Sequence, residues 1–198
     1  MNRVVIASKN KHKLEEIKAI LKDFSLDIKS MDEVGLADLE IIEDGNTFEE
    51  NAMKKAQEVM NASGNIAIAD DSGLEVEAIG NKPGVYSARF AGENASDQEN
   101  NQKLLRLLER VPFEKRNAKF VSVIAVAFPD GRKLSVRGEI LGKIGYEEKG
   151  ENGFGYDPLF IVEAFQKTFA EMRPSLKNKI SHRAKALEKL KNELKKFI

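Results

Sequence analysis

Two adjacent carboxylates, Asp70 and Asp71, follow an apolar run (residues 66–69, Ile-Ala-Ile-Ala) and precede Ser72 and Gly73. The apolar run predicts a buried strand, and carboxylates at the end of a buried strand are costly unless a positive group meets them. Mg²⁺, which binds one or two carboxylates together with substrate phosphates, would supply that charge. One carboxylate could also draw a proton from attacking water. The alternative is a tight turn, because Asp, Ser and Gly are ordinary turn residues.

A further acidic residue and a lysine flank the start of a predicted helix. Thr47 and Glu50 fit a capping box, which predicts a helix over residues 47–62. Glu43 precedes this cap, and it either caps the helix or shares a metal ion with the acidic pair. Lys55 lies about two helical turns after the cap. Its position alone leaves open whether it faces the acidic pair or solvent.

The first predicted strand (residues 4–7) leads into a helix through a basic turn. Free backbone N–H groups at such a corner attract phosphate, and the helix dipole strengthens the attraction. The Walker A pattern is absent. A solvated first helical turn is the alternative. The residues of this candidate phosphate site are Ser8, Lys9, Asn10, Lys11, His12 and Lys13.

A glycine-dense loop (residues 150–158) carries Phe154 and Tyr156. Its Gly-x-x-Gly-x-Gly spacing is not the dinucleotide-binding fingerprint. Glycines beside an aromatic ring let a flat base approach the backbone closely, and base–aromatic stacking contributes about 1–3 kcal/mol. The loop therefore predicts a slot for a base. The alternative is a tight loop whose two aromatic side chains belong to the core.

His182 and Arg183 open the last predicted helix, shortly after Lys177. Their donors could bind an acceptor such as a purine 6-oxo group. A helix cap with surface charge is the alternative, and the pair gains meaning only in combination with the other motifs.

The elements that must position these residues alternate between strand and helix at first and include an antiparallel hairpin later. Strands are predicted at residues 4–7, 26–28, 66–69, 74–79, 119–128, 133–142 and 159–162, and helices after the basic turn and at 47–62, 96–110 and 181–197. The last helix has Leu187, Leu190 and Leu194 at helical spacing. This order predicts an α/β fold with a mixed sheet flanked by helices. No linker or internal repeat interrupts the chain, so we expect a single domain over residues 1–198.

The charge balance limits the possible partners. The chain has 32 basic and 32 acidic residues, which argues against bulk electrostatic binding to nucleic acid, although lysines gather in residues 177–196. The absence of cysteine excludes disulfides and thiolate metal sites. No apolar stretch approaches membrane-spanning length, and the N-terminal one is too short for a signal peptide. We therefore expect a cytoplasmic protein without membrane partners.

Six motifs, in this order along essentially the whole chain, resemble those of the inosine triphosphate pyrophosphatase family. They are Ser-x-Asn-x-x-Lys at residues 8–13, Thr-Phe-x-x-Asn-Ala at 47–52, Ala-Asp-Asp-Ser-Gly-Leu at 69–74, Pro-Gly-x-x-Ser-Ala-Arg at 83–89, Gly-Phe-Gly-Tyr-Asp-Pro at 153–158 and Ser-His-Arg at 181–183. Many members carry Thr-Gly-Asn or Thr-Thr-Asn in the first motif. Lys9 is therefore a departure, while Ser8 keeps the hydroxyl.

The resemblance implies a homodimer of elongated α/β subunits, each with a long mixed sheet and two lobes with a central active-site cleft. It implies Mg²⁺-dependent hydrolysis of ITP, dITP and XTP to the monophosphate and pyrophosphate, which removes deaminated purines from the nucleotide pool. In the family pattern, Asp71 is the proton acceptor and a metal ligand, while Glu43 and Asp70 help to hold the metal. Lys13 and Lys55 neutralise charge that moves toward the leaving pyrophosphate.

The resemblance also implies which residues hold the substrate. Residues 8–13 and Ser72 would cradle the phosphates. Phe154 would stack on the base. The residues that would shape the base slot or recognise the 6-oxo purine are Gly155, Tyr156, Asp157, Lys177, His182 and Arg183, and Arg89 would approach the base or the phosphates.

Donor and acceptor chemistry gives a reason for this base preference. Inosine and xanthine present an acceptor at position 6 where adenine presents a donor, and a site built for the acceptor can discriminate by ~10⁴ or more. Rejection of GTP needs a penalty for the 2-amino group, which no motif identifies. Two alternatives remain: a related enzyme acting on other modified nucleotides, and a non-catalytic nucleotide or RNA binder that uses the lysine-rich tail.

Overall fold

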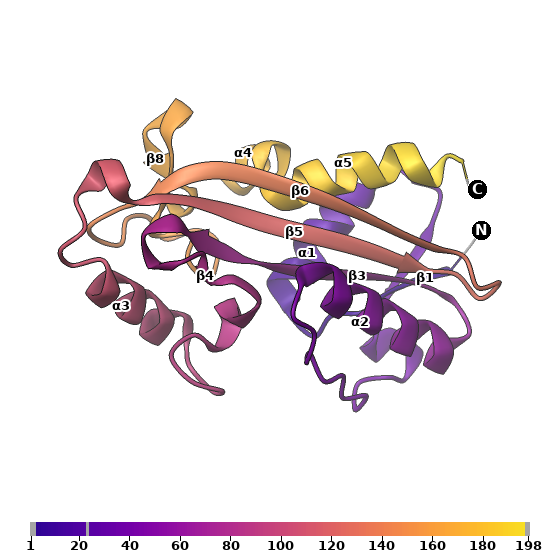
Figure 1. Cartoon of the computed structure of the whole chain (residues 1–198). Coiled ribbons are helices and arrows are strands. Elements are labelled where there is room, and N and C mark those ends of the chain that lie inside the picture. The colour runs from indigo at the N-terminus through magenta and orange to yellow at the C-terminus, as the bar shows by residue number, and fades with distance from the viewer. Residues whose placement is uncertain (1–2, 23, 197–198) are drawn as a thin grey trace. The chain divides into compact units, whose positions relative to one another are not determined.

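The computed structural model describes residues 3–22 and 24–196, and its strands form a mixed sheet flanked by helices (Figure 1). The strand order is β2-β1-β3-β5-β6-β7-β8, and β4 pairs with β3. The strands are β1 Arg3–Ile6, β2 Asp27–Ser30, β3 Ile66–Val76, β4 Lys82–Pro83, β5 Asn117–Ala127, β6 Lys133–Ile144, β7 Phe160–Val162 and β8 Lys167–Thr168. The predicted α/β class is therefore confirmed.

Five α-helices occur among the described residues: α1 Lys11–Leu21, α2 Phe48–Ser63, α3 Asp97–Leu107, α4 Pro174–Ile180 and α5 His182–Leu194. Short 3-10 helices lie at Asp32–Val34, Glu77–Ile79, Gly84–Arg89, Phe113–Lys115, Glu163–Phe165 and Phe169–Glu171. No sequence pattern predicted α4. The predicted last helix extended to residue 197, which lies outside the described residues, and α5 ends at Leu194.

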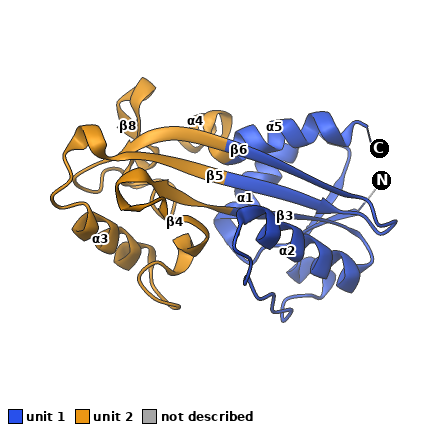
Figure 2. Cartoon of the chain, viewed as in Figure 1, with its two compact units in different colours: residues 1–71, 122–138, 183–198 blue, residues 72–121, 139–182 orange. Residues whose placement is uncertain are grey.

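The chain divides into two compact units (Figure 2). Unit 1 comprises residues 1–71, 122–138 and 183–198, and unit 2 comprises residues 72–121 and 139–182. Strands β3, β5 and β6 contribute residues to both. The single domain and the cleft between two lobes stay predictions.

Unit 1 is built on parallel strands. Strand β1 pairs in parallel with β2 and with β3, and Val5 lies opposite Lys29 on one side and Ala67 on the other. Helices α1, α2 and α5 contribute residues to this unit. Its core contains Val4, Ile6, Ile17, Leu21, Ile68, Ile124, Val126, Leu187, Leu190 and Leu194. The apolar positions predicted for the last helix are therefore buried, as expected.

Unit 2 has its own core and mainly antiparallel pairing. Strand β6 pairs with β7, and β7 pairs with β8, both antiparallel. Helix α3 buries Leu104 and is followed by the buried Leu108. The rest of this core includes Leu74, Val76, Phe120, Ile144, Tyr156, Leu159, Phe160 and Phe169.

Local side-chain signals set the helix starts. Thr47 accepts from the Glu50 N–H and Glu50 reaches back, so the predicted capping box of α2 is present, and Ser96 and Glu99 do the same for α3. Asn10 Oδ1 accepts from the Lys13 N–H at 3.1 Å and so begins α1. None of the helices in the described part of the chain is long and apolar enough to cross a membrane.

Candidate active site

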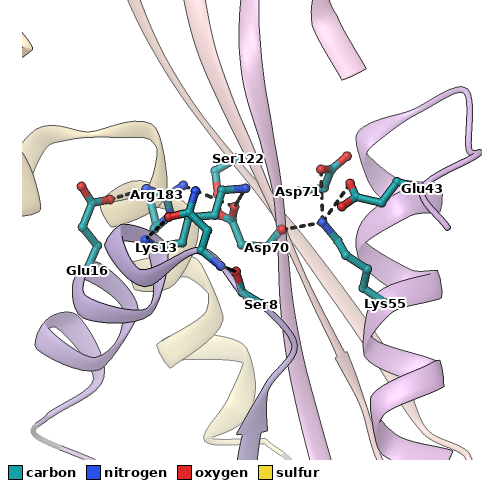
Figure 3. Close-up of polar contacts among 10 residues, drawn as sticks. Ser8, Lys13, Glu16, Glu43, Lys55, Asp70, Asp71, Ser122 and Arg183 are labelled. Atoms are coloured by element: carbon teal, nitrogen blue, oxygen red, sulfur yellow. Dashed lines mark hydrogen bonds and ion pairs between the residues drawn. The ribbon is translucent and has the colours of Figure 1, made fainter. Parts of the chain in front are cut away.

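Asp70 and Asp71 lie inside strand β3 rather than in a turn. The sequence analysis expected two strands separated at this point, but β3 runs without interruption from Ile66 to Val76. Successive side chains of a strand point to opposite faces. Accordingly, Asp70 and Asp71 extend to opposite sides of β3 and belong to two different clusters of unit 1 (Figure 3).

Asp70 is surrounded by cationic groups and a hydroxyl. Lys13 Nζ lies 2.8 Å from Oδ1, and Arg183 Nε lies 3.1 Å from Oδ2. Ser122 Oγ donates to Oδ2 at 2.7 Å, and the Arg183 guanidinium also contacts Glu16. Burial would raise the pKa of Asp70, but Arg183 and Lys13 outweigh it and hold that pKa well below its usual value. Asp70 is therefore ionised and positions Lys13 and Arg183.

Ser122 is a site residue that the sequence analysis missed. It is fully buried in β5, and its hydroxyl satisfies one oxygen of Asp70. The available signal was a single hydroxyl in the apolar run Val121-Ser122-Val123-Ile124, because a buried polar side chain requires a hydrogen-bond partner.

Asp71 forms the second cluster with Lys55 and Glu43. Lys55 Nζ lies 3.3 Å from Asp71 Oδ1 and 3.1 Å from Glu43 Oε2, and it donates to the Asp70 carbonyl oxygen at 3.0 Å (Figure 3). The side chain of Lys55 is buried. The structure thus answers the question that the sequence left open: Lys55 faces the Asp71 carboxylate and the backbone carbonyl of Asp70, but not the Asp70 carboxylate.

The two carboxylates beside Lys55 differ in their proton affinity. Burial raises the pKa of Asp71 to about 6, and the attraction of Lys55 and Lys13 offsets this only in part. For Glu43, burial is outweighed by Lys55, so its pKa is lowered. Burial lowers the pKa of Lys55, but Asp71 and Glu43 together raise it above its ordinary value. A carboxyl that titrates near neutral pH is suited to accept a proton from water.

Glu43 lies in an irregular segment that is tied to α2. The Gly45 N–H donates to Asn51 Oδ1 at 2.8 Å, and Asn51 is fully buried. A Cβ at Gly45 would lie 2.6 Å from that oxygen, so the close approach requires glycine. This contact fixes the chain two residues after Glu43.

The donor set fits a Mg²⁺ ion with few protein ligands. Asp71 Oδ2 is buried and has no hydrogen-bond partner in the described part of the chain. Asp71 and Glu43 both face the same Lys55 ammonium. No group of three or more Asp, Glu, His or Cys suited to a metal occurs among residues 3–22 and 24–196. Mg²⁺ is usually bound by one or two protein carboxylates, and the phosphates of the substrate serve as further ligands.

The basic turn has an ordered backbone but exposed side chains. Ser8 Oγ accepts from the Asn10 N–H at 3.1 Å, and Asn10 caps α1. Lys9, Asn10, Lys11 and His12 are exposed. Within this candidate phosphate site, Lys13 contacts Asp70. The roles of the other residues stay predictions.

The predicted base loop lies in unit 2. Asp157 Oδ2 accepts from the Phe154 N–H at 3.0 Å and from Lys177 Nζ at 2.6 Å. Lys177 Nζ also lies 4.8 Å from the centre of the Phe154 ring. Gly153 has φ +77° and leaves no room for a Cβ, which would lie 2.0 Å from Asp157 Oδ2. The structure thus brings Phe154, Asp157 and Lys177 together.

The other residues predicted to contact the base in the loop and nearby segments, Tyr156, His182 and Arg89, belong to unit 2. Tyr156 is buried and its hydroxyl donates to the Ser87 carbonyl at 2.7 Å, as in the alternative that assigned it to the core. His182 is buried and stacks on Phe120, with ring centres 4.7 Å apart. Arg89 Nε lies 3.9 Å from Glu93 Oε1. Their roles toward a base stay predictions.

Several solved structures resemble this one. The structure of the Staphylococcus aureus Ham1 protein superposes with a TM-score of 0.88 at 41% identity and covers 100% of both chains. The structure of a nucleoside-triphosphatase / dITP/XTP pyrophosphatase from Mycobacterium abscessus has a TM-score of 0.77 at 39% identity, over 95% of this chain and 98% of the other.

Sequence comparison leads to the same group of proteins. The chain is 49% identical over 201 residues to the dITP/XTP pyrophosphatase of Clostridium perfringens, covering 98% of each. It is 50% identical over 194 residues to that of Thermoanaerobacter pseudethanolicus, covering 98% of this chain and 97% of the relative. Fold and relatives together define a nucleoside triphosphate pyrophosphatase, which confirms the predicted class of enzyme. A model of the Ham1 family matches residues 4–193, and the chain belongs to that family.

Proposed function

We propose that the chain hydrolyses dITP, XTP and ITP to the corresponding monophosphate and pyrophosphate, with Mg²⁺ as cofactor. Water adds across the anhydride between the α- and β-phosphates, so that one product carries the nucleoside and the other is pyrophosphate. Relatives of about 50% identity are named for dITP and XTP, and ITP shares their 6-oxo group. The alternative of a non-catalytic binder is not retained, because relatives of about 50% identity over nearly the whole chain are named as pyrophosphatases.

The observation that carries this proposal is the cluster of Asp71, Lys55 and Glu43. It combines a carboxyl of raised pKa, an ammonium group and a second carboxylate within 3.3 Å of that ammonium. In the proposed reaction Asp71 accepts the proton of the attacking water, while Lys55 and Lys13 offset the charge of the phosphates. Asp70 acts indirectly, by holding Lys13 and Arg183.

Asp71 and Glu43 would hold the Mg²⁺ ion. When bound, the ion lowers the pKa of water and neutralises phosphate charge. The orphaned Oδ2 of Asp71 supports this assignment, because a buried carboxylate oxygen without a hydrogen bond is unfavourable unless a cation meets it.

For the purine, the proposal assigns stacking to Phe154 and polar recognition to Lys177, His182 and Arg183. Lys177 is buried beside the Phe154 ring and held by Asp157, so its position is defined before any ligand binds. We also propose that the enzyme acts as a homodimer and in the cytoplasm, as the family resemblance implies.

The first experiment measures pyrophosphate release from dITP, ITP, XTP, GTP and ATP, each with Mg²⁺ and with a chelator. We expect rapid Mg²⁺-dependent release from dITP, ITP and XTP and slow release from GTP and ATP. Equal rates on all five would retain the phosphate chemistry and contradict the assigned base preference. Release in the presence of the chelator would contradict the role of the metal.

A further inference from the structure

Helix α3 carries two polar side chains, Asp97 and Asn101, that bind both backbone groups of a single residue in the loop of residues 150–158. The Gly155 N–H donates to Asp97 Oδ2 at 2.7 Å, and the Gly155 carbonyl accepts from Asn101 Nδ2 at 3.1 Å. The two side chains are four residues apart and therefore lie on one face of the helix. Neither belongs to a motif that indicated chemistry.

Asn101 is anchored firmly enough to hold the loop. It is 2% exposed, and its Nδ2 also donates to Glu148 Oε1 at 2.7 Å. Its neighbour Asn100, likewise buried, accepts from the Ala91 N–H at 2.7 Å and donates to the Ala88 carbonyl at 3.1 Å. Buried amides are costly unless they are hydrogen-bonded. Both ends of the Asn100 amide and the nitrogen of the Asn101 amide have such bonds, which tie α3 to neighbouring segments of unit 2.

The residue that this arrangement controls is Phe154. Its own N–H is held by Asp157 at 3.0 Å, and the next N–H along the chain, that of Gly155, is held by Asp97. The peptide groups on both sides of the Phe154 Cα are thus hydrogen-bonded to carboxylates. Gly155 has φ +62°, which a residue with a side chain rarely adopts, so the loop relies on these contacts for a defined position.

We infer that Asp97 and Asn101 are positioning residues that hold Phe154, through Gly155, for stacking on the purine base of the substrate. The inference rests on the proposed function and adds an element that none of the family motifs includes. Neither side chain has to touch the substrate. Their contribution is to the affinity for the base and not to the chemical step.

The test compares steady-state constants for ITP hydrolysis. Asp97→Ala and Asn101→Ala should each raise KM about five- to tenfold, the expected cost of one hydrogen bond, and leave kcat nearly unchanged. Stacking is equal in the bound substrate and in the transition state, so its loss appears in KM alone. The double variant should raise KM less than the product of the two single effects, because both act through Gly155.

Two further variants separate positioning from helix stability. Asp97 is also an acidic residue in the first turn of α3, where it interacts favourably with the helix dipole. Asp97→Asn removes the charge but keeps an oxygen that can accept from the Gly155 N–H, so we expect a KM close to that of the parent. Gln102→Ala, an exposed position of the same helix, serves as the control for substitution in α3.

The outcomes separate this inference from the proposed function. A parental KM in Asp97→Ala, or a fall in kcat at constant KM, would overturn the inference while the function stands. An equal KM for Asp97→Asn and Asp97→Ala would show that charge and not the acceptor matters, and would also overturn it. If the unmodified chain hydrolyses none of dITP, XTP and ITP under conditions in which its thermal unfolding is cooperative, the proposed function fails and the inference falls with it.

Discussion

At the scale of single residues, the adjacent carboxyls of Asp70 and Asp71 differ in their partners and in their pKa. A strand places neighbouring side chains on opposite faces, so two adjacent acids cannot share one contact. Asp70 is neutralised by Lys13 and Arg183, and its pKa is held low. Asp71 has one oxygen without a hydrogen bond to any residue that the structure describes, and burial raises its pKa to about 6. The first is suited to hold cations in place and the second to exchange a proton.

This difference predicts how Asp71 affects stability. A carboxyl whose pKa is raised in the folded state binds its proton more tightly there than in the unfolded chain. The free energy of unfolding therefore decreases as the pH rises from about 4 to about 6, and it stays lower above that range. Without divalent cations at pH 7.5, Asp71→Asn should raise the free energy of unfolding by roughly 1–3 kcal/mol. With Mg²⁺ present, the same substitution should abolish hydrolysis.

The measurement is urea unfolding in the presence of a chelator at pH 7.5 and at pH 4. At pH 4 the increase in the free energy of unfolding caused by Asp71→Asn should vanish. Asp44→Asn is the matched control, because Asp44 is exposed and Lys54 lowers its pKa. A loss of stability for Asp71→Asn at pH 7.5 would contradict the assignment of a strained, ionised carboxylate.

At the scale of elements, the site depends on how helices are joined to the sheet. Arg116 is 2% exposed, and its guanidinium donates hydrogen bonds to three backbone carbonyls. It donates to Leu108 at the end of α3 at 2.7 Å, to Val111 at 2.9 Å and to Gly145 after β6 at 2.8 Å. Helix α3 is thereby held at its C-terminal end, while its N-terminal half holds Gly155.

We expect Arg116→Lys to be destabilising although it keeps the charge. An ammonium group cannot span three carbonyls that a planar guanidinium reaches together, so the free energy of unfolding should fall by about 2–4 kcal/mol. Urea unfolding checks this, with Arg110→Lys as the exposed control on the same connection. A change below about 0.5 kcal/mol, typical of surface substitutions, would show that Arg116 does not fasten α3.

Sequence patterns predicted elements well where the signal was local. The capping box at Thr47 located the start of α2, because the cap is a contact between residues three apart. The interruption expected at Asp70 was wrong, since turn-forming residue types do not make a turn when sheet pairing continues through them. The burial of Lys55 and the partnership of Ser122 with Asp70 arise from contacts between distant segments, which no local pattern contains.

At the scale of the whole molecule, the predicted site residues fall into two groups, one within each unit. Asp70, Asp71, Lys55 and Glu43 belong to unit 1, and Phe154, Asp157 and Lys177 belong to unit 2. Each unit also has a hydrophobic core of its own. Asp70, Asp71, Phe154 and Asp157 lie within the six motifs, whereas Glu43, Lys55 and Lys177 lie outside them and were implied by the family resemblance.

A bound cation should stabilise the whole fold, because it binds the native cluster and not the unfolded chain. At 10–100 times its dissociation constant, Mg²⁺ should raise the free energy of unfolding by about 1–3 kcal/mol. Thermal unfolding at constant ionic strength checks this. Glu43→Gln and Asp71→Asn should lose the effect, whereas Asp44→Asn should keep it. If Mg²⁺ stabilised Asp71→Asn as much as the parent protein, the ion would have to bind at another site.

The two carboxylates assigned to the cation are carried by chain segments of different stiffness. Asp71 belongs to β3, an interior strand of the sheet, whereas Glu43 lies in residues 39–45, which are neither helix nor strand. Mg²⁺ requires near-ideal octahedral geometry, while Ca²⁺ tolerates longer and irregular distances. For an ion held by this pair, any adjustment to ionic radius must come from Glu43. In the proposed site, the short tether from Glu43 through Gly45 to Asn51 would therefore limit which ions can bind.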